Sequence, residues 1–281
     1  MKKMVLGLLI ILFVTVACGS ITPMTPAQPN VETIVAATFS ALTASAPPTM
    51  EAGQITPDGT PVNTAEISFL IPNGIANDAT SVTGTEVEFP YVNPSNGAMP
   101  QHVKLTLNLY ALSGTQLQPH IMIFRSEEYA QYTENTAAII SEMQSLQYVD
   151  GQPLSEKLGS DFITQIHAVN FKNGSGVRYL TQVFMNFQAV NNEELFYYYQ
   201  GMTDDDKYYV QAILPINAPF LAVDGDPNGP LPADGIPFNT NDFPGYLETV
   251  TQQLNSTDTF SFTPYLEYLD ALIESMQVTG F

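Results

Sequence analysis

One acidic loop carries the residues that are best spaced to hold a metal ion. The segment DGDPNGPLPADG places Asp224, Asp226 and Asn228 at alternate positions, directly before a glycine. An EF-hand calcium loop begins in the same way, and Ca²⁺ takes six to eight oxygen ligands. The twelfth position is Gly235 instead of a bidentate glutamate, with Asp234 just before it, and prolines exclude flanking helices. Two interpretations follow: a helix-free calcium site at Asp224, Asp226, Asn228 and Asp234, or a solvated turn.

Tyrosines concentrate on two adjoining predicted strands, LFYYYQG and KYYVQAILPI. Alternation along the first strand sends Phe196 and Tyr198 to one face of the sheet and Tyr197 and Tyr199 to the other. A tyrosine offers a rigid apolar ring and a hydroxyl, so an exposed row of them stacks on sugar rings or docks a peptide. We predict a ligand surface at Tyr197, Tyr199 and Tyr208 for a surface glycan, peptide or protein. The alternative is aromatic pairing across strands that stabilises the sheet.

The residue types that most often perform catalysis are poorly arranged. His102, His120 and His167 lie far apart in the sequence and show neither HxxxH nor HExxH spacing for zinc. Ser175, in NGSGV, lacks the glycine two residues before it that a GxSxG nucleophile elbow requires. Adjacent carboxylates occur, but the sequence places no two of them in one cleft. We therefore identify no catalytic residue, and nothing here argues for an enzyme.

The single cysteine of the chain follows an apolar leader. The chain begins MKKMVLGLLIILFVTVAC, in which two lysines precede fourteen uncharged residues, 4–17. As a helix these residues reach about 21 Å, which is short of the roughly 30 Å hydrocarbon core of a bilayer. This pattern is typical of a cleaved signal peptide. A leftover cysteine in an exported protein needs an explanation, although a chance cysteine after an ordinary signal peptide is the alternative.

Residues Thr15-Val16-Ala17-Cys18 resemble a bacterial lipobox, in which a peptidase cuts before a cysteine whose thiol carries diacylglycerol. Thr15 departs from the pattern, because leucine or another aliphatic residue is usual there. The resemblance implies that residues 1–17 are removed and that Cys18 becomes a lipid anchor. The protein is then extracytoplasmic and attached to the cell membrane through its acylated N-terminus.

The charge of the chain argues against nucleic-acid partners. The sequence has 8 basic and 28 acidic residues, a formal net charge of −20. Removing residues 1–17 takes away two lysines and leaves −22. Such a surface repels phosphate backbones and gains little from anionic lipid headgroups.

The segment from Cys18 to Asn63 is rich in Pro, Thr and Ala and cannot bury enough apolar surface to fold. Within it, NVETIVAATFSALTAS has apolar residues near helical spacing and predicts a short helical stretch. We interpret residues 18–63 as a membrane tether.

Residues 64–281 predict one globular α+β domain, with an antiparallel sheet in meander order. In HVKLTLNLYAL the leucines and Val103 alternate with polar residues, so Val103, Leu105, Leu107 and Leu109 are expected to point inward. Further strands are expected at EISFLIP, HIMIF, FITQIHAVNF and VRYLTQVFMNF, besides the two tyrosine-rich strands.

One central helix and two C-terminal helices are expected to pack on this sheet. The central helix is SEEYAQYTENTAAIISEMQSLQ, with Ser126 as its N-cap. The C-terminal helices are NDFPGYLETVTQQLN and TPYLEYLDALIESMQV, with Pro264 in the first turn of the second.

The body of the chain is similar to a set of uncharacterised secreted proteins of filamentous, Chloroflexus-like bacteria. The resemblance rests on NGSGVRYLTQ, NNEELFYYYQGMTDDDKYYVQAILP and FTPYLEYLDALIESMQV. It implies a surface lipoprotein and no particular activity. We expect a lipid-anchored domain that acts by binding or structural association at the cell surface. The alternatives are an exported hydrolase with a carboxylate site and a calcium-stabilised adhesion module.

Overall fold

The computed structural model describes residues 58–86, 98–146, 148, 150, 152–160, 162–184 and 188–281. The chain from Gln54 to Phe281 groups into one compact unit. Cys18, the leader and the tether up to residue 57 lie outside the described residues. No helix in the described ranges is both long enough and apolar enough to cross a bilayer.

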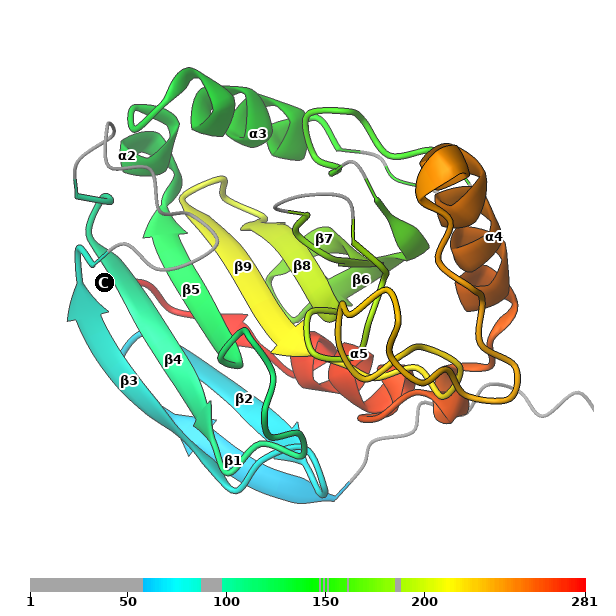
Figure 1. Ribbon diagram of the computed structural model, residues 1–281. Helices are drawn as coiled ribbons and strands as arrows, with labels where there is room; N and C mark the ends of the chain where they lie inside the picture. The colour runs from blue at the N-terminus through cyan, green and yellow to red at the C-terminus, as the bar shows by residue number, and fades with distance from the viewer. Residues whose placement is uncertain are drawn as a thin grey trace, which may run out of the picture. The chain divides into compact units, whose positions relative to one another are not determined.

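Seven antiparallel strands form the main sheet, in the order β3-β4-β5-β9-β8-β7-β6 (Figure 1). The sheet consists of two meanders, β3 to β5 and β6 to β9. They form one sheet because β9, the last strand of the second meander, pairs with β5, the last strand of the first. This confirms the antiparallel α+β class. The strands are β3 (Asp78–Gly84), β4 (His102–Asn108), β5 (His120–Arg125), β6 (Thr164–Phe171), β7 (Gly174–Thr181), β8 (Phe196–Thr203) and β9 (Tyr208–Pro215).

A second, smaller sheet contains β1 (Gly59–Asn63), β2 (Ile67–Pro72) and β10 (Gln277–Val278), in the order β1-β2-β10. The first and last strands of the described chain therefore lie in the same sheet.

Helices cover both faces of the main sheet. On one face, α2 (Ser126–Ala130) and α3 (Glu134–Gln144) pack over a core that includes Met122, Phe124 and Tyr209. On the other face, α4 (Phe243–Ser256), α5 (Leu266–Glu274) and the small sheet enclose the larger core. Strand β5 is buried from His120 to Phe124 because it has a layer on each side. Two short 3₁₀ turns, Thr240–Asp242 and Thr259–Ser261, precede α4 and α5.

The expectation of one central helix that starts from a Ser126 cap is wrong. The segment contains two helices: α2 ends at Ala130, with Gln131 as its C-cap, and Thr133 is the N-cap of α3. Its hydroxyl accepts from the Thr136 backbone N–H at 3.0 Å, and the Thr136 hydroxyl accepts from the Thr133 N–H at 2.9 Å. Ser126 is the first residue of α2, and its hydroxyl donates to the Asp206 carbonyl instead of capping the helix.

Most of the predicted alternation on β4 is confirmed, but its last member is not. Val103, Leu105 and Leu107 are buried, whereas Leu109 is 78% exposed. The strand ends at Asn108, and Leu109 turns the chain with a φ of 50°. Alternation stops predicting side-chain direction where the backbone leaves the extended region.

The turn between β6 and β7 is tighter than its glycine-rich sequence suggests. Phe171 pairs with Gly174, so Lys172 and Asn173 alone form the turn. Gly176 lies inside β7, where a Cβ atom would overlap the Gln200 carbonyl and the Tyr199 hydroxyl. The role of Gly176 is therefore to let Tyr199 pack closely against the backbone of β7, and not to bend the chain.

Candidate functional site

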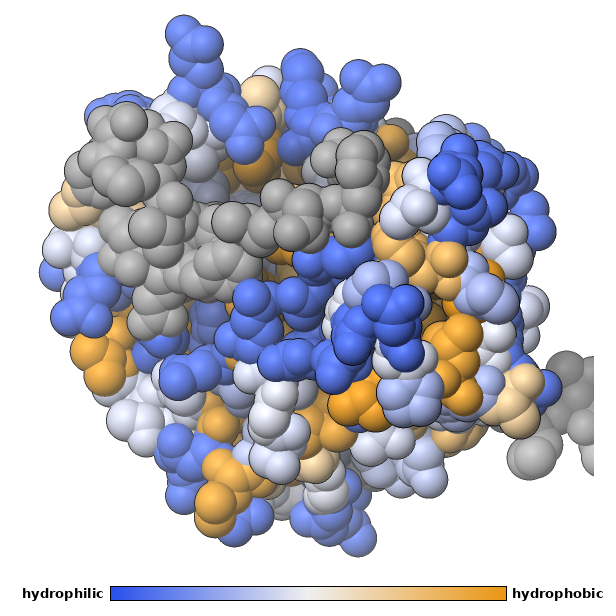
Figure 2. All heavy atoms as spheres, in the orientation of Figure 1, coloured by the Kyte–Doolittle hydropathy of each residue, from blue (hydrophilic) through white to orange (hydrophobic). Residues whose placement is uncertain are grey.

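A cavity of about 790 Å³ lies between α3 and the face of the main sheet formed by β7 and β8. Its volume falls within the range of about 300–1,000 Å³ that is common for small-molecule sites. Hydrophilic side chains stand along the outer side of α3, above this face of the sheet (Figure 2). This cavity is the candidate functional site.

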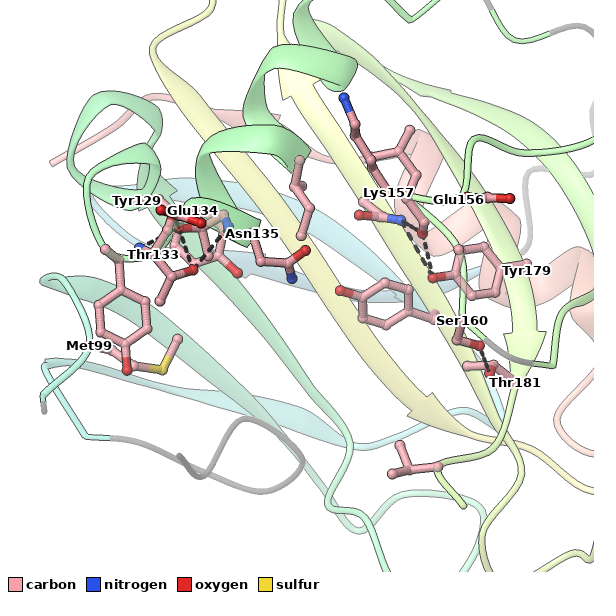
Figure 3. A pocket seen from close by; sticks show the side chains of 18 of the residues that line it. Met99, Tyr129, Thr133, Glu134, Asn135, Glu156, Lys157, Ser160, Tyr179 and Thr181 are labelled. Carbon is pink, nitrogen blue, oxygen red and sulfur yellow. Dashed lines mark hydrogen bonds between the residues drawn. The ribbon is translucent and has the colours of Figure 1, made fainter. Parts of the chain in front are cut away.

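The cavity has two polar walls and an aromatic floor. Figure 3 shows Thr133, Glu134 and Asn135 on one side, at the start of α3, and the loop of residues 156–160 with Tyr179 and Thr181 on the other. The floor is β8. Because side chains alternate along a strand, Phe196, Tyr198 and Gln200 all face the cavity.

Gln200 fixes the loop wall to the sheet. Its Nε2 donates to the Leu158 carbonyl at 2.5 Å, and its Oε1 accepts from the Tyr209 hydroxyl at 3.1 Å. The Tyr179 hydroxyl donates to the same Leu158 carbonyl at 2.8 Å. One loop carbonyl is thus held by two buried side chains of the sheet, so this wall is preorganised before any ligand enters.

Aromatic rings supply the apolar part of the floor. The rings of Tyr179 and Tyr198 are 5.3 Å apart between centroids, and Phe196 meets Tyr198 edge to face at 6.1 Å. Tyr198 is half-buried, and its hydroxyl accepts from the Gln211 side chain. Burial raises the pKa of Tyr179 well above its usual value, so this hydroxyl stays neutral and donates a hydrogen bond.

A pair of hydroxyls completes the loop wall. The Ser160 and Thr181 oxygens are 2.7 Å apart, and each is within hydrogen-bond distance of the Phe162 carbonyl, at 2.8 and 2.6 Å. The two hydroxyls have only one proton each to donate in these three contacts, whereas each hydroxyl oxygen can accept two hydrogen bonds. The pair therefore keeps acceptor capacity for a ligand hydroxyl.

The charged residues of the lining lie at its walls and not in its floor. Glu134 and Glu156 are exposed and stand on opposite sides of the cavity (Figure 3). Lys157 forms an ion pair with Glu142 of α3, with Nζ 3.2 Å from Oε1. The lining therefore offers hydrogen bonds and ring faces, and its two carboxylates do not meet as an acid–base pair.

The tyrosine prediction chose the wrong face of β8. Tyr197 and Tyr199 are fully buried against the layer that contains α5. The Tyr197 hydroxyl donates to Asp270 Oδ1 at 2.9 Å, and the Tyr199 hydroxyl donates to the Val169 carbonyl at 3.2 Å. Neither can meet a ligand from solvent. Sequence reasoning missed Tyr198, although the same alternation assigned it to the opposite, cavity-facing side.

The predicted ligand residue Tyr208 lies outside this cavity. It is half-buried near the turn between β8 and β9, and its ring centroid is 6.0 Å from that of Phe281. It lines a second hollow of about 550 Å³ beside α2 and α3. Its role in ligand binding stays a prediction.

The acidic loop folds around its own backbone. Asp224 Oδ1 accepts from the Asp226 N–H at 3.0 Å, and Asp226 Oδ1 accepts from the Asn228 N–H at 2.9 Å. These are Asx turns, which the sequence also predicts for an Asp/Asn/Gly segment. The Asp234 carbonyl accepts from the Gln253 side chain at 3.3 Å. In the described ranges no group of three or more His, Cys, Asp or Glu side chains is placed to hold a metal ion. Calcium binding here stays a prediction.

The three histidines and Glu194 have structural partners. His102 and His120 are buried and contact the Pro100 and Gln118 carbonyls at 3.0 and 2.7 Å. His167 Nδ1 lies 2.6 Å from Asp150 Oδ2 on the outer side of β6. Glu194 accepts from three side-chain amides, those of Gln182, Gln188 and Asn191.

A buried ion pair lies on the opposite face of the sheet from the cavity. Arg178 of β7 binds Asp270 of α5 through two nitrogens, Nε to Oδ1 and Nη2 to Oδ2, each at 3.1 Å. Burial by itself lowers the pKa of Arg178, but the charge and hydrogen bonds of Asp270 raise it above the usual value. Arg178 also donates to the Gln165 carbonyl. Together with the hydrogen bond from Tyr197 of β8 to Asp270, these contacts connect β6, β7, β8 and α5.

Comparison with protein-family models and with curated proteins finds no match for the chain. Function is therefore inferred from the cavity, its lining and the N-terminal sequence.

Proposed function

We propose that the protein is a lipid-anchored extracytoplasmic binding protein. The apolar leader and Cys18 support this, because a diacylated cysteine after a cleaved leader holds a protein on a membrane. Each buried CH₂ contributes about 0.8 kcal/mol, so two acyl chains bind firmly where one binds only reversibly. The Pro/Thr/Ala-rich segment that follows Cys18 then connects the anchor to the folded domain, which begins with β1 (Gly59–Asn63) and not at residue 64 as expected.

The ligand we propose for the cavity is uncharged, has an apolar face and carries several hydroxyls, as a short neutral oligosaccharide does. The observation that carries this is the uncharged part of the lining: the Tyr198 ring in the floor and the Ser160–Thr181 hydroxyl pair in the loop wall. Aromatic rings stack on the apolar face of a sugar, and amides and hydroxyls bond to its hydroxyl groups. The net charge of −20 disfavours anionic ligands.

The proposed alternatives have less support. An exported hydrolase that uses two carboxylates needs them on either side of one bond, but the carboxylates of the lining, Glu134 and Glu156, are exposed at opposite walls. A calcium-stabilised adhesion module depends on the loop of residues 224–234, whose aspartates already accept backbone hydrogen bonds. A peptide or protein partner would use the same aromatic floor.

Binding can be tested with three trisaccharides: neutral maltotriose, neutral cellotriose and anionic trigalacturonate. We expect a neutral sugar to raise the Tm of the protein and to titrate in calorimetry, and the anionic sugar to do neither. Tyr198→Leu keeps apolar volume but removes the ring and hydroxyl, so it should abolish the effect. Tyr265→Leu is the matched control, because Tyr265 is an exposed tyrosine outside this cavity. Binding that both variants lose, binding that both retain, or no neutral sugar bound would each contradict the saccharide proposal.

Anchoring has its own test. Mass spectrometry of the N-terminal peptide from a membrane fraction should show a chain that begins at a diacylated Cys18. Cys18→Ser removes the thiol that carries the lipid, so the peptidase should no longer cut and the chain should keep residues 1–17. A mature wild-type chain that begins at Cys18 without acyl groups, or that begins at another residue, would overturn the anchor.

A further inference from the structure

The two edges of the main sheet are finished differently. An edge strand exposes unpaired backbone groups that can pair with another chain, and proteins commonly block such edges with bulges, prolines or charges. At one edge, β6 is blocked. Asp150 Oδ1 accepts from the Ala168 N–H at 2.8 Å, and Asn255 Oδ1 accepts from the Gln165 N–H at 2.7 Å. A register shift between Thr164 and His167 bends the strand further.

The opposite edge, β3, has no bulge and no proline, and its one charged residue is Asp78 at its first position. Its seven residues, DATSVTG, contain no proline, lysine or arginine. They pair with β4 in unbroken register from Asp78 to Gly84, and the strand lies at the margin of the sheet (Figure 1). Residues 80–83 are exposed, with Val82 at 60%. Within the described part of the chain, no strand other than β4 pairs with β3.

We infer that β3 is a self-association edge, which pairs antiparallel with β3 of a second copy of this chain. Pairing centred on Ser81 uses all seven residues and places Thr80 of one copy opposite Val82 of the other. Exposed β-branched side chains of this kind stabilise cross-strand pairs.

Charge favours this partner and this register. A chain with a net charge of −20 repels its own copies wherever acidic side chains face each other. Strand β3 carries one charge, Asp78, at its first position. In the Ser81-centred register Asp78 lies opposite Gly84 at each end, so no two carboxylates are directly opposed. The edge therefore carries little charge for a chain as acidic as this one.

The association should be weak in solution. Stable interfaces bury about 1,200–2,000 Å² in total, more than one pair of seven-residue strands supplies. Tethering both copies to one membrane raises their effective concentration, so pairing should be favoured there. Only this enhancement rests on the proposed lipid anchor; the strand pairing itself does not.

Disulfide trapping tests the pairing directly, because Cys18 is the single natural cysteine. In the proposed register the two Ser81 residues face each other. Opposed Cα atoms in antiparallel pairs are about 4.5–5.5 Å apart, which suits a disulfide. The full-length Ser81→Cys chain in membranes should therefore form a dimer rapidly under mild oxidation with copper phenanthroline. Val223→Cys is the control, because Val223 is 72% exposed and lies outside β3.

Register and specificity have separate readouts. Ala79→Cys and Thr83→Cys chains should cross-link when mixed and much less when alone. Val82→Lys, placed in the Ser81→Cys chain, should reduce the dimer yield at least about tenfold, since lysine on an edge strand opposes pairing. Equal yields for Ser81→Cys and Val223→Cys, or no effect of Val82→Lys, would overturn the inference.

The anchor and the edge can fail independently. Producing each variant without the leader, residues 1–17, and with Cys18→Ser removes the anchor, and the measurement is then repeated in solution at high protein concentration. Specific cross-linking at Ser81 that survives there but is not enhanced on membranes would contradict anchoring and keep the edge. Absence of Ser81 cross-linking in both settings would refute the edge alone.

Discussion

Asp270→Asn is expected to be among the most destabilising single changes in the domain. The substitution keeps the size of the side chain but removes the charge that Arg178 faces. Arg178 and Asp270 are 3% and 9% exposed, so solvent cannot replace the lost partner. Tyr197 would also lose its charged acceptor, which now lies 2.9 Å from its hydroxyl.

The magnitude follows from leaving one buried charge uncompensated. Removing one partner of a buried ion pair costs about 3–5 kcal/mol. For a domain of this size, each kcal/mol lowers Tm by about 2–4 °C, so the expected fall is about 6–20 °C. Tyr197→Phe removes only the hydrogen bond and should cost about 1.5–3 kcal/mol, the usual contribution of a bond to a charged group.

A double-variant cycle separates the pair from its members. Urea unfolding followed by circular dichroism gives the free energy of unfolding for Asp270→Leu, Arg178→Met and the double variant. The double variant should be more stable than either single variant, because it buries no unpaired charge. Additive losses, or an Asp270→Asn variant that loses less than about 1 kcal/mol, would refute this account of the pair.

Three further predictions concern the core, the glycines and the acidic loop. Burial raises the pKa of Tyr197, Tyr199 and Tyr209 well above 10, so their neutral forms stabilise the fold fully below about pH 10 and this contribution is lost as pH rises further. In the difference between the wild-type protein and a Tyr199→Phe variant, tyrosinate absorbance should appear only together with loss of circular dichroism, and earlier ionisation in that difference would contradict the prediction. Gly176→Ala should cost about 1–3 kcal/mol in urea unfolding, because its Cβ would overlap Tyr199 and Gln200, whereas Gly84→Ala, with open space around it, should change little. If residues 224–234 bind calcium, a hundredfold excess of calcium over Kd adds about 2.7 kcal/mol to the free energy of unfolding and raises Tm by several degrees. The double substitution Asp224→Ala with Asp226→Ala must remove this effect, and identical melts with calcium and with chelator would reject the site.

Local sequence patterns determined most of the secondary structure. Period-two alternation predicted β4, and short apolar segments predicted β2 and β5. The apolar residues Leu266, Leu269, Leu272, Ile273 and Met276, which lie at helical spacing in the last predicted helix, are fully buried. These patterns succeed because they reflect the geometry of a single strand or helix. The break before α3 was also local, since Thr133 and Thr136 form a capping box, but the longer apolar pattern concealed it.

Tertiary structure alone decided which face of each strand meets solvent and which residues become neighbours. Alternation divides Tyr197 and Tyr198 between two faces, but the position of α5 buries one face and the gap under α3 opens the other. The Arg178–Asp270 pair joins residues 92 positions apart in the sequence. Strand β5 pairs with β9 although α2, α3 and three strands lie between them in the sequence. Such contacts depend on how layers pack over long sequence separations. The sequence by itself could therefore name the tyrosines but not the cavity that they line.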